Sequence, residues 1–386
     1  MENSNDKNIL NYSFDDLDIK DNLLRGIYAY GFEKPSNIQY KSIPIINSGK
    51  DIIAQSQSGT GKTGAFTIGM LNNLDETIKK TQYIIVTPTH ELAKQIYEVI
   101  TELTNYMEVY IVKVIGKTNI NDSRNELMKD PQIIVATPGR LLDMLNRNYI
   151  FTDSIKSLII DEADEMLSSG FMESIYNIVQ MMPKTTQMCL FSATMPKEIL
   201  DLTQYFMKDP VSILVNKEEL TLEGIKQFFI DLQAYRWKYD VLDDIYDTIN
   251  ITQCIIYVNT KNTLHNLYDR LRSSDYPVSY IHGDMQQTER EENLNNFRGG
   301  QTRILLTTDL LARGIDIQQL SLVINFDLPK NKETYIHRIG RSGRYGRKGV
   351  AINFVTTDEL QDLKDIEKHY NTQIEAMPQN LADYLN

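Results

Sequence analysis

The sequence has few cysteines and no long apolar run, and each absence excludes a class of protein. Its 386 residues include only two cysteines, Cys189 and Cys254, one in each half of the chain and each within an apolar stretch. Such residues are typical of buried free thiols and not of a disulfide framework or a metal site. No apolar run reaches the roughly 18 residues of a membrane-spanning helix. We therefore expect no association with a membrane.

An excess of positive charge is also absent: 40 lysines and arginines face 52 aspartates and glutamates, so the net charge of the chain is −12 at pH 7. This charge argues against a broadly basic coat for nucleic acid, but it allows a local groove of backbone N–H groups and a few arginines. The stretch MENSNDKNIL lacks the basic-then-apolar order of a signal peptide. We expect a cytoplasmic protein, with the nucleus as the alternative, and we predict a monomer.

What the sequence does contain is an alternation of strand-like and helix-like segments. Runs such as KDIIAQ, QYIIVTP and KSLIIDE in the first half, and QCIIYVNT and TRILLTTD in the second, resemble strands buried on both faces. Between them, HELAKQIYEVITEL places its apolar residues on one helical face. The pattern predicts an α/β fold with two mostly parallel sheets covered by helices.

A polar stretch, VNKEELTLEGIKQ, interrupts this alternation at residues 215–227. Its lack of strand character predicts a linker at 217–226, between a first domain at 1–216 and a second domain at 227–386. Ligands of such folds bind at the carboxyl ends of the strands, and the motifs below all fall there.

A glycine-rich loop, AQSQSGTGKT, follows a strand-like run and precedes a helix-like one. This is the context of a phosphate loop, although Ser56 stands where the loose Walker pattern has its first glycine. Backbone N–H groups would hold the phosphates, Lys62 would reach the β- and γ-phosphates, and Thr63 would bind Mg²⁺. A glycine-rich turn before a helix is the alternative. The predicted loop residues are Ser58, Gly59, Thr60, Gly61, Lys62 and Thr63.

The segment IIDEADEML places four acidic residues directly after an apolar strand, and the carboxylates of Asp161, Glu162 and Asp164 crowd together there. Asp161 ends the strand, where a Walker-B carboxylate would bind Mg²⁺, and Glu162 could orient or deprotonate the attacking water. An isolated Asp-Glu pair could also be an acidic helix N-terminus. The phosphate loop in the same half of the chain favours the metal and water roles.

These residues together carry a family resemblance. The segment DEAD at 161–164 resembles motif II of the DEAD-box RNA helicases, and GFEKPSNIQ, PTHELA, TPGR, SAT, HGD, TTDLLARGID and HRIGRSGR resemble further motifs in the family's order. The stretches ELTLEGIKQFF and TQIEAMP resemble the translation initiation factor 4A branch, and the exon-junction-complex paralogue matches almost as well. The resemblance implies two tandem RecA-like domains of the P-loop NTPase type, with ATP and Mg²⁺ as cofactors.

The resemblance also implies roles for residues around the nucleotide. Phe32 would stack on adenine, and Gln39 would hydrogen-bond to its edge. In the basic segment HRIGRSGRYGRKG, whose guanidinium groups suit phosphate oxygens, Arg341 and Arg344 would act as arginine fingers. Taken alone, that segment could be a solvated basic loop. The further nucleotide contacts implied in the second domain are Asp316 and Tyr345.

The SAT segment resembles the motif that links ATP hydrolysis to unwinding. Ser192 and Thr194 would hydrogen-bond to the DEAD segment, and Asp164 and His337 would belong to the same polar network. Without the resemblance, SAT would indicate only a turn after a strand.

RNA contacts are implied at the carboxyl ends of strands in both domains. Small and hydroxyl side chains there can present backbone N–H groups to phosphates, so binding should tolerate different sequences, and the 2′-hydroxyl could distinguish RNA from DNA. In the first domain the implied residues are Pro88, Thr89, His90, Gly116, Thr137, Pro138, Gly139 and Arg140. In the second domain they are Asn259, Thr260, Gly283 and Thr308.

Two residues depart from the family pattern. His90 stands where the family usually has arginine, and Lys117 replaces the second glycine of a Gly pair. Because an imidazole changes charge near neutral pH, we predict that RNA affinity changes between about pH 6 and 8 relative to a His90→Arg variant. Identical pH dependence in the two proteins would contradict this prediction.

The predicted function is that of an ATP-dependent RNA helicase, which binds single-stranded RNA, unwinds short duplexes locally and takes part in translation initiation. A scaffold protein of the initiation-factor type is the partner that the resemblance implies. The alternatives are an ATP-gated RNA clamp of the exon-junction type and a translocating DNA helicase. Strand displacement with multiple turnover favours the helicase over the clamp, and a DNA-stimulated ATPase would favour the third candidate.

Overall fold

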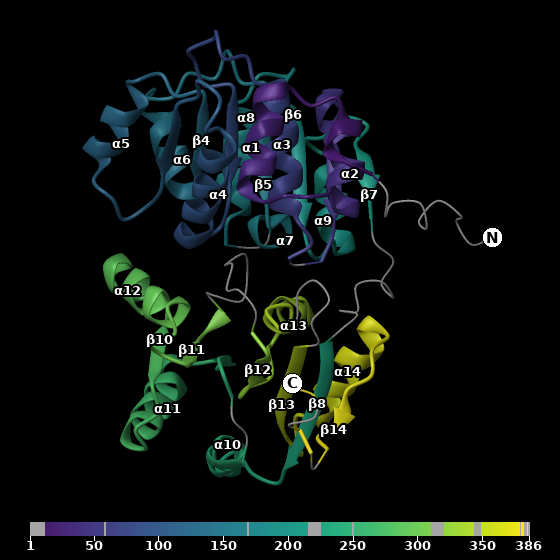
Figure 1. Cartoon of the computed structure of the whole chain (residues 1–386), viewed down its shortest axis with the longest axis vertical. Helices are drawn as coiled ribbons and strands as arrows, with labels where there is room; N and C mark the ends of the chain where they lie inside the picture. The colour runs from purple at the N-terminus through teal and green to yellow at the C-terminus, as the bar shows by residue number, and fades with distance from the viewer. Residues whose placement is uncertain are drawn as a thin grey trace, which may run out of the picture. The chain divides into compact units, whose positions relative to one another are not determined.

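The computed structural model contains two compact units, residues 1–214 and 215–386, each built around one sheet (Figure 1). It describes residues 12–57, 59–167, 170–214, 225–248, 251–309, 320–342, 349–378, 380–381 and 384. Within these ranges each sheet has seven strands, and every strand pairing is parallel. The predicted α/β class is confirmed, and the sheets are fully parallel where mostly parallel ones were predicted.

Unit 1 has the strand order β3-β4-β2-β5-β6-β1-β7. Its strands are β1 (Ile52–Gln55), β2 (Tyr83–Val86), β3 (Ile111–Val114), β4 (Ile133–Ala136), β5 (Ser157–Asp161), β6 (Gln187–Ser192) and β7 (Val211–Ile213). Its helices are the 3₁₀ turn η2 (Phe14–Leu17), α1 (Asp21–Tyr30), α2 (Asn37–Asn47), α3 (Lys62–Asn73), α4 (His90–Leu103), α5 (Ile120–Leu127), α6 (Pro138–Asn146), α7 (Ala163–Met166), α8 (Met172–Gln180) and α9 (Lys197–Thr203).

The central strands of unit 1 are buried along their whole length and mostly apolar because helices cover both faces of the sheet. Successive side chains of a strand point to opposite faces, so Ile84 and Ile85 of β2 pack into two different cores. One core includes Phe66 of α3 beside Ile85, and the other includes Leu141 of α6 and Ile178 of α8. This double burial explains why the strands were visible in the sequence as continuous apolar runs.

Unit 2 has the strand order β10-β11-β9-β12-β13-β8-β14. Its strands are β8 (Ile225–Leu232), β9 (Cys254–Tyr257), β10 (Val278–Ile281), β11 (Ile304–Thr307), β12 (Leu322–Asn325), β13 (Gly349–Thr356) and β14 (Glu375–Ala376). Its helices are α10 (Trp237–Thr248), α11 (Lys261–Ser273), α12 (Gln287–Arg298), α13 (Lys332–Ile339) and α14 (Leu360–Tyr370).

The boundary between the units differs slightly from the predicted linker. Strand β8 already begins at Ile225, inside the segment predicted as linker, and pairs with β13 along its whole length. Ile225 packs against a buried cluster of unit 2. The polar residues that precede it in the chain gave no sign of this packing. Residues 217–224 of the predicted linker lie outside the described ranges.

Two further predictions concern the state of the cysteines and membrane-spanning helices. Cys189 and Cys254 are both buried and free, as predicted. Among the described helices, none combines the length and apolar character that crossing a bilayer requires.

Candidate active site at the carboxyl ends of the strands

The loop between β1 and α3 has the backbone geometry of a phosphate loop. Gly59 and Gly61 have φ values of 81° and 99°, in the left-handed region that favours glycine. Gly61 precedes the first residue of α3, so backbone N–H groups at the helix start are available to an anion. Lys62 donates from Nζ to the carbonyl oxygens of Ser56 (2.8 Å) and Gln57 (3.0 Å), which draws its ammonium group across the loop. Ser58 lies outside the described residues.

The two residues implied in adenine binding lie beside this loop. Gln39 donates from Nε2 to the carbonyl oxygen of Gly61 at 3.2 Å and accepts at Oε1 from the backbone N–H of Ser36. A Cβ added at Gly64 would lie 2.5 Å from Nε2 of Gln39 and 3.3 Å from the ring of Phe32. The first turn of α3 therefore approaches Phe32 and Gln39 closely, and a side chain at position 64 would displace the amide group of Gln39.

Asp161 and Glu162 form an acidic corner at the end of β5. Glu162 has a left-handed backbone (φ 52°, ψ 54°), which is strained for a residue other than glycine and is typical of functional turns. Its backbone N–H donates to Oδ1 of Asp161 at 3.0 Å, and its Oε2 is buried with no hydrogen-bond partner among the described residues. Burial, and next the charge of Glu162, raise the pKa of Asp161 to about 7, while Lys62 opposes the increase.

Asp164 is held by the SAT segment at the end of β6. Its two carboxylate oxygens accept hydrogen bonds from the hydroxyl groups of Ser192 (2.7 Å) and Thr194 (2.5 Å). Gln55 donates from Nε2 to the carbonyl oxygen of Ala193, which joins the same segment to β1. The ends of β1, β5 and β6 are thus connected by hydrogen bonds.

The residues implied in RNA binding in unit 1 begin two helices at the same edge of the sheet. Thr89 caps α4 by accepting from the backbone N–H of Leu92, and Pro138 occupies the first position of α6, directly after Thr137. Oγ1 of Thr137 also accepts from the backbone N–H of Gly116 at 3.2 Å. Pro88 precedes the first cap, and Gly139 lies in α6 with open space where a Cβ would be.

His90, Lys117 and Arg140 surround the Gly116 loop. A Cβ added at Gly116 would lie 3.3 Å from Nε2 of His90, so the imidazole lies against this loop. Lys117 is exposed and has a left-handed φ of 58°. Arg140 donates to the hydroxyl group and carbonyl oxygen of Thr118 and to the hydroxyl group of Ser123. Arg140 therefore ties the Gly116 loop to the start of α6.

Unit 2 presents its implied RNA residues on three loops. Thr260 caps α11 by accepting from the backbone N–H of Thr263, Gly283 is exposed after β10, and Thr308 follows β11. Asn259 donates from its backbone N–H to Oδ2 of Asp327 at 2.8 Å. These loops all lie at the carboxyl edge of the second sheet.

The implied nucleotide residues of unit 2 are only partly within the described ranges. Arg341 follows α13, is buried and donates from Nε to the carbonyl oxygen of His337 at 3.4 Å. His337 itself is buried in the last turn of α13. Asp316, Arg344 and Tyr345 lie outside the described residues.

Several residues that shape the site were missed by sequence reasoning. Ser36 accepts from the backbone N–H of Gln39 and forms a capping box with it, a pattern that the spacing S-x-x-Q could have revealed. Gly64 and Gln55 carried no comparable signal, because a helical glycine and a strand glutamine have many ordinary explanations. Arg338 is the fourth such residue, and its buried guanidinium donates to Oδ1 of Asp309 at 2.6 Å and to Oδ1 of Asn259 at 2.9 Å.

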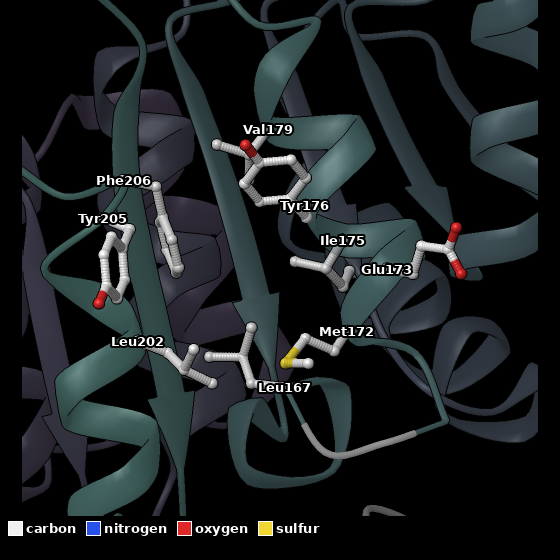
Figure 2. A pocket seen from close by; sticks show the side chains of 9 residues that line it. All are labelled: Leu167, Met172, Glu173, Ile175, Tyr176, Val179, Leu202, Tyr205 and Phe206. Atoms are coloured by element: carbon white, nitrogen blue, oxygen red, sulfur yellow. The ribbon is translucent and has the colours of Figure 1, made fainter.

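An apolar groove lies apart from these residues on unit 1 (Figure 2). Its volume is about 440 Å³, and none of the residues predicted from the sequence to form a site lines it. Figure 2 shows side chains from α8 and from the segment after α9 facing each other across it. The lining residues are Leu167, Met172, Glu173, Ile175, Tyr176, Val179, Leu202, Tyr205 and Phe206.

Comparison with known proteins gives relatives along nearly the whole chain. Residues 36–202 match the family described as DEAD/DEAH box helicase, and residues 237–346 match the helicase conserved C-terminal domain. The ATP-dependent RNA helicase eIF4A of Aspergillus niger is 54% identical over 373 residues, which cover 97% of this chain and 94% of that protein.

Solved structures agree with this assignment. S. cerevisiae Dbp5 bound to RNA and ADP BeF3 aligns with a TM-score of 0.90 and 37% identity, over 96% of this chain and 97% of that one. A Dbp5 variant bound to a Gle1 variant and IP6 aligns with a TM-score of 0.80 and 37% identity, over 97% of this chain and 96% of that one. The two units thus correspond to two tandem RecA-like domains, and the chain belongs to the DEAD-box family of ATP-dependent RNA helicases, of the eIF4A type.

Proposed function

We propose that this helicase uses unit 1 to hold and hydrolyse ATP and uses both units to hold single-stranded RNA, unwinding short duplexes locally during translation initiation. The observation that carries the proposal is the hydrogen-bonded corner of unit 1, where the ends of β1, β5 and β6 meet. In this corner the loop after β1, three acidic residues and the SAT segment lie next to one another.

The nucleotide would lie against the phosphate loop, with adenine stacked on Phe32 and hydrogen-bonded at its edge to Gln39. Glycine at positions 61 and 64 leaves room there, because any Cβ would lie within 2.6 Å of Gln39. In the ATP-bound state, Lys62 would exchange its two carbonyl acceptors for phosphate oxygens, which are the stronger partners for an ammonium group. We infer further contacts to the nucleotide from Asp316 and Tyr345 of unit 2.

The acidic corner fits a magnesium ion held by Asp161 and Thr63, partly through water. A buried carboxylate whose pKa is raised by burial and by a neighbouring acid is stabilised by an added cation, and carboxylate and hydroxyl oxygens are ligands that Mg²⁺ accepts. When bound, the ion would neutralise charge on the phosphates. Glu162, whose buried Oε2 has no hydrogen-bond partner in the described part of the chain, would orient and deprotonate the attacking water.

Arg341 and Arg344 of unit 2 would complete the site as arginine fingers on the γ-phosphate. We infer that ATP and RNA together bring the two units into the hydrolytic arrangement, so that hydrolysis depends on bound RNA. Asp164, Ser192, Thr194 and His337 would couple the two events through hydrogen bonds. Since the fingers and the phosphate loop belong to different units, neither unit should hydrolyse ATP efficiently alone.

RNA would be held by the strand-end loops through its phosphates and 2′-hydroxyl groups, without reading of bases. The capped starts of α4 and α11 support this, because helix N-termini present backbone N–H groups to anions. Arg140 would add a charge in unit 1.

We infer a cytoplasmic monomer that gains efficiency from a scaffold protein touching both units. Two observations support this: the curated relatives are eIF4A proteins, and a related Dbp5 variant has been seen bound to another protein. A pull-down from a translation extract, with the α6 variant Arg140→Ala as a control for RNA bridging, tests whether the scaffold binds independently of RNA.

The function is tested by measuring ATP hydrolysis with and without single-stranded RNA, and strand displacement on a short duplex. We expect RNA to stimulate the ATPase, DNA of the same sequence to stimulate it less, and displacement to continue over many turnovers. A long-lived ATP-dependent RNA complex without turnover would show the clamp of the exon-junction type, and equal stimulation by DNA would show a DNA helicase. Lys62→Ala provides the inactive control.

A further inference from the structure

One buried lysine, Lys238 in the first turn of α10, has carboxylate partners from two other segments of unit 2. Its side chain has no exposed surface. Nζ donates to Oε2 of Glu359 at 3.1 Å, and Oδ1 of Asp327 lies 3.6 Å from it. Nζ also lies over the ring of Tyr235, 4.8 Å from the ring centroid. The ammonium group is therefore in contact with two carboxylates and an aromatic face.

The place of Lys238 in the sheet plan matches that of the phosphate-loop lysine in unit 1. In the two strand orders β8 corresponds to β1, and the helix that follows each strand has a lysine in its first turn, Lys62 in α3 and Lys238 in α10. Strands β12 and β13, which precede Asp327 and Glu359, correspond to β5 and β6. Carboxylates of the protein thus face the lysine of unit 2, whereas phosphates are proposed to face Lys62. Unit 2 needs no nucleotide to complete its arrangement.

The two carboxylates differ in what they hold besides the lysine. Oε2 of Glu359 accepts from the backbone N–H (3.0 Å) and the hydroxyl group (2.9 Å) of Thr356, at the end of β13. Glu359 also immediately precedes α14, so these contacts tie Lys238 to the end of β13 and the start of α14. Asp327 instead contacts the loop between β9 and α11, which is inferred to bind RNA.

Asp327 holds this loop through its two carboxylate oxygens. Oδ2 accepts from the backbone N–H of Asn259 at 2.8 Å, and Oδ1 accepts from the hydroxyl group of Tyr235 at 2.9 Å. That hydroxyl group lies 3.5 Å from Oγ1 of Thr263, which lies 2.9 Å from Oγ1 of Thr260. Asn259 and Thr260 are the residues of the loop that are inferred to contact RNA. Asp327 is only 5% exposed, so it holds the loop from within the fold.

A buried carboxylate keeps one arrangement when its charge is compensated and its oxygens are hydrogen-bonded. Taking a charge out of water is costly, and a close opposite charge together with hydrogen bonds offsets the cost. Lys238 provides the charge, while Asn259 and Tyr235 provide the hydrogen bonds. Because the acceptor is a carboxylate, the hydrogen bond to Asn259 is stronger than one between neutral groups. The backbone at Asn259 is therefore held by a carboxylate whose charge Lys238 compensates.

We propose that Asp327, compensated by the buried Lys238, is a positioning residue that fixes the loop at Asn259 and Thr260 for RNA binding, with or without bound nucleotide. The proposal rests on the RNA contacts proposed for that loop. Asp327 does not touch RNA and acts through the backbone of Asn259. A loop that is already ordered loses less conformational freedom when it binds, so the contact raises RNA affinity.

The test compares two charge-matched variants of the full-length chain, Asp327→Asn and Glu359→Gln. Each removes one negative charge beside Lys238, but only the first alters the contact to Asn259. The probe is a fluorescent single-stranded RNA, titrated without nucleotide and with a non-hydrolysable ATP analogue. We expect Asp327→Asn to weaken RNA binding by about tenfold in both conditions, because an amide offers one acceptor oxygen to two buried donors. Glu359→Gln is the matched control and should bind RNA as the wild type does.

Three further readouts separate positioning from a loss of stability or of charge. The RNA concentration that half-maximally stimulates the ATPase should rise about tenfold in Asp327→Asn, while the rate at saturating RNA and the affinity for the ATP analogue stay unchanged. Tyr235→Phe should weaken RNA binding several-fold, because Asp327 loses one of its two hydrogen-bond donors. The charge effect has the opposite sign, because removing a negative charge strengthens binding to phosphates.

Several outcomes would overturn the proposal. Wild-type RNA affinity in Asp327→Asn would show that Lys238 and its carboxylates serve stability alone. An equal loss of RNA affinity in Asp327→Asn and Glu359→Gln would assign the effect to general disorder of unit 2. If Asp327→Asn does not fold, Tyr235→Phe decides, because Tyr235 is 42% exposed and its ring is retained. A wild-type protein without RNA-stimulated ATPase activity would contradict the proposed function itself.

Discussion

The two units share one sheet plan but only half of their functional loops. In order along each sheet, β3-β4-β2-β5-β6-β1-β7 of unit 1 corresponds strand by strand to β10-β11-β9-β12-β13-β8-β14 of unit 2. The loops after the first three positions carry similar residues in both units. The corresponding pairs are Thr89 and Thr260, Gly116 and Gly283, and Thr137 and Thr308.

The other loops have diverged. After β1, unit 1 has the phosphate loop, whereas after β8 unit 2 has the short segment Gln233–Arg236, which contains no glycine. Strand β5 ends in Asp161 at the acidic corner, but β12 ends in Asn325, whose amide is bonded to Asn353 and Arg338. The loops inferred to hold RNA are therefore present in both units, whereas the phosphate loop and the acidic corner have no counterpart at the matching strand ends of unit 2.

The largest expected effect concerns the acidic corner, which occurs in unit 1 and not at the matching strand end of unit 2. Glu162→Gln should reduce ATP hydrolysis by about 100-fold or more, because an amide cannot accept the proton of the attacking water. ATP affinity should stay close to that of the wild type, and RNA affinity in the presence of ATP should not fall. Steady-state ATPase rates and analogue binding check this prediction. Glu165→Gln, in the short helix α7 that directly follows Glu162, is the control and should hydrolyse ATP normally.

A smaller effect, on RNA affinity, is expected from the loops that correspond between the two units. It should be equal for substitutions in either unit. Thr89→Ala and Thr260→Ala each remove a helix cap worth about 1 kcal/mol and should each weaken RNA binding several-fold. Because the two sites belong to different units, their effects on binding should add in the double variant. The serine variants keep the capping hydroxyl and should behave as the wild type. If only one of the two alanine variants lost RNA affinity, the corresponding loops would not contribute equally to RNA binding.

Much of this organisation was predictable from the sequence. Strands buried on both faces appear as apolar runs, so the two parallel sheets and the strand-end position of Asp161 followed from local patterns. The phosphate loop and the acidic segment gave a mechanism through their residue types alone. Resemblance was needed for Phe32 and the SAT segment, whose residues have no unusual spacing.

The rest depended on contacts between distant segments. Arg338 was visible only as one of several basic residues, because its hydrogen-bond partners Asp309 and Asn259 lie 29 and 79 positions away in the chain. Strand β8 was missed at its start because Ile225 follows a polar stretch and gains its burial only from tertiary packing. Lys117 was recognised as a departure, but its left-handed backbone could not be inferred without the fold.

The free energy of unfolding of unit 2 should depend on pH through His282, which precedes Gly283. Nδ1 of His282 accepts from the backbone N–H of Asp284 at 3.3 Å, and burial, followed by the nearby His265, lowers the pKa of His282. Asp284 and Glu289 oppose this decrease, and Lys261 adds to it.

The sign of the effect follows from the lowered pKa of His282. Below an ordinary imidazole pKa near 6.5, the unfolded chain binds more protons at this site than the folded one. The free energy of unfolding of unit 2 should therefore decrease as the pH falls from about 6.5 toward the lower folded-state pKa. Urea unfolding at pH 7.5 and 5.5 measures the decrease, and His282→Asn should reduce it. An equal decrease in wild type and variant would assign the effect to other groups.

The smallest effect concerns Lys117, in the loop of unit 1 that corresponds to the Gly283 loop. Lys117→Gly should leave the free energy of unfolding unchanged or raise it by up to about 1 kcal/mol, because glycine relieves the left-handed strain but gains entropy in the unfolded chain. Lys80→Gly is the matched control: Lys80 is exposed and lacks a positive φ, so only the entropic loss of about 0.5–1 kcal/mol should appear. Denaturant unfolding of both variants measures the difference. If the two substitutions destabilise unit 1 equally, the backbone at Lys117 is not strained, and the Gly pair of the family was replaced here without a conformational cost.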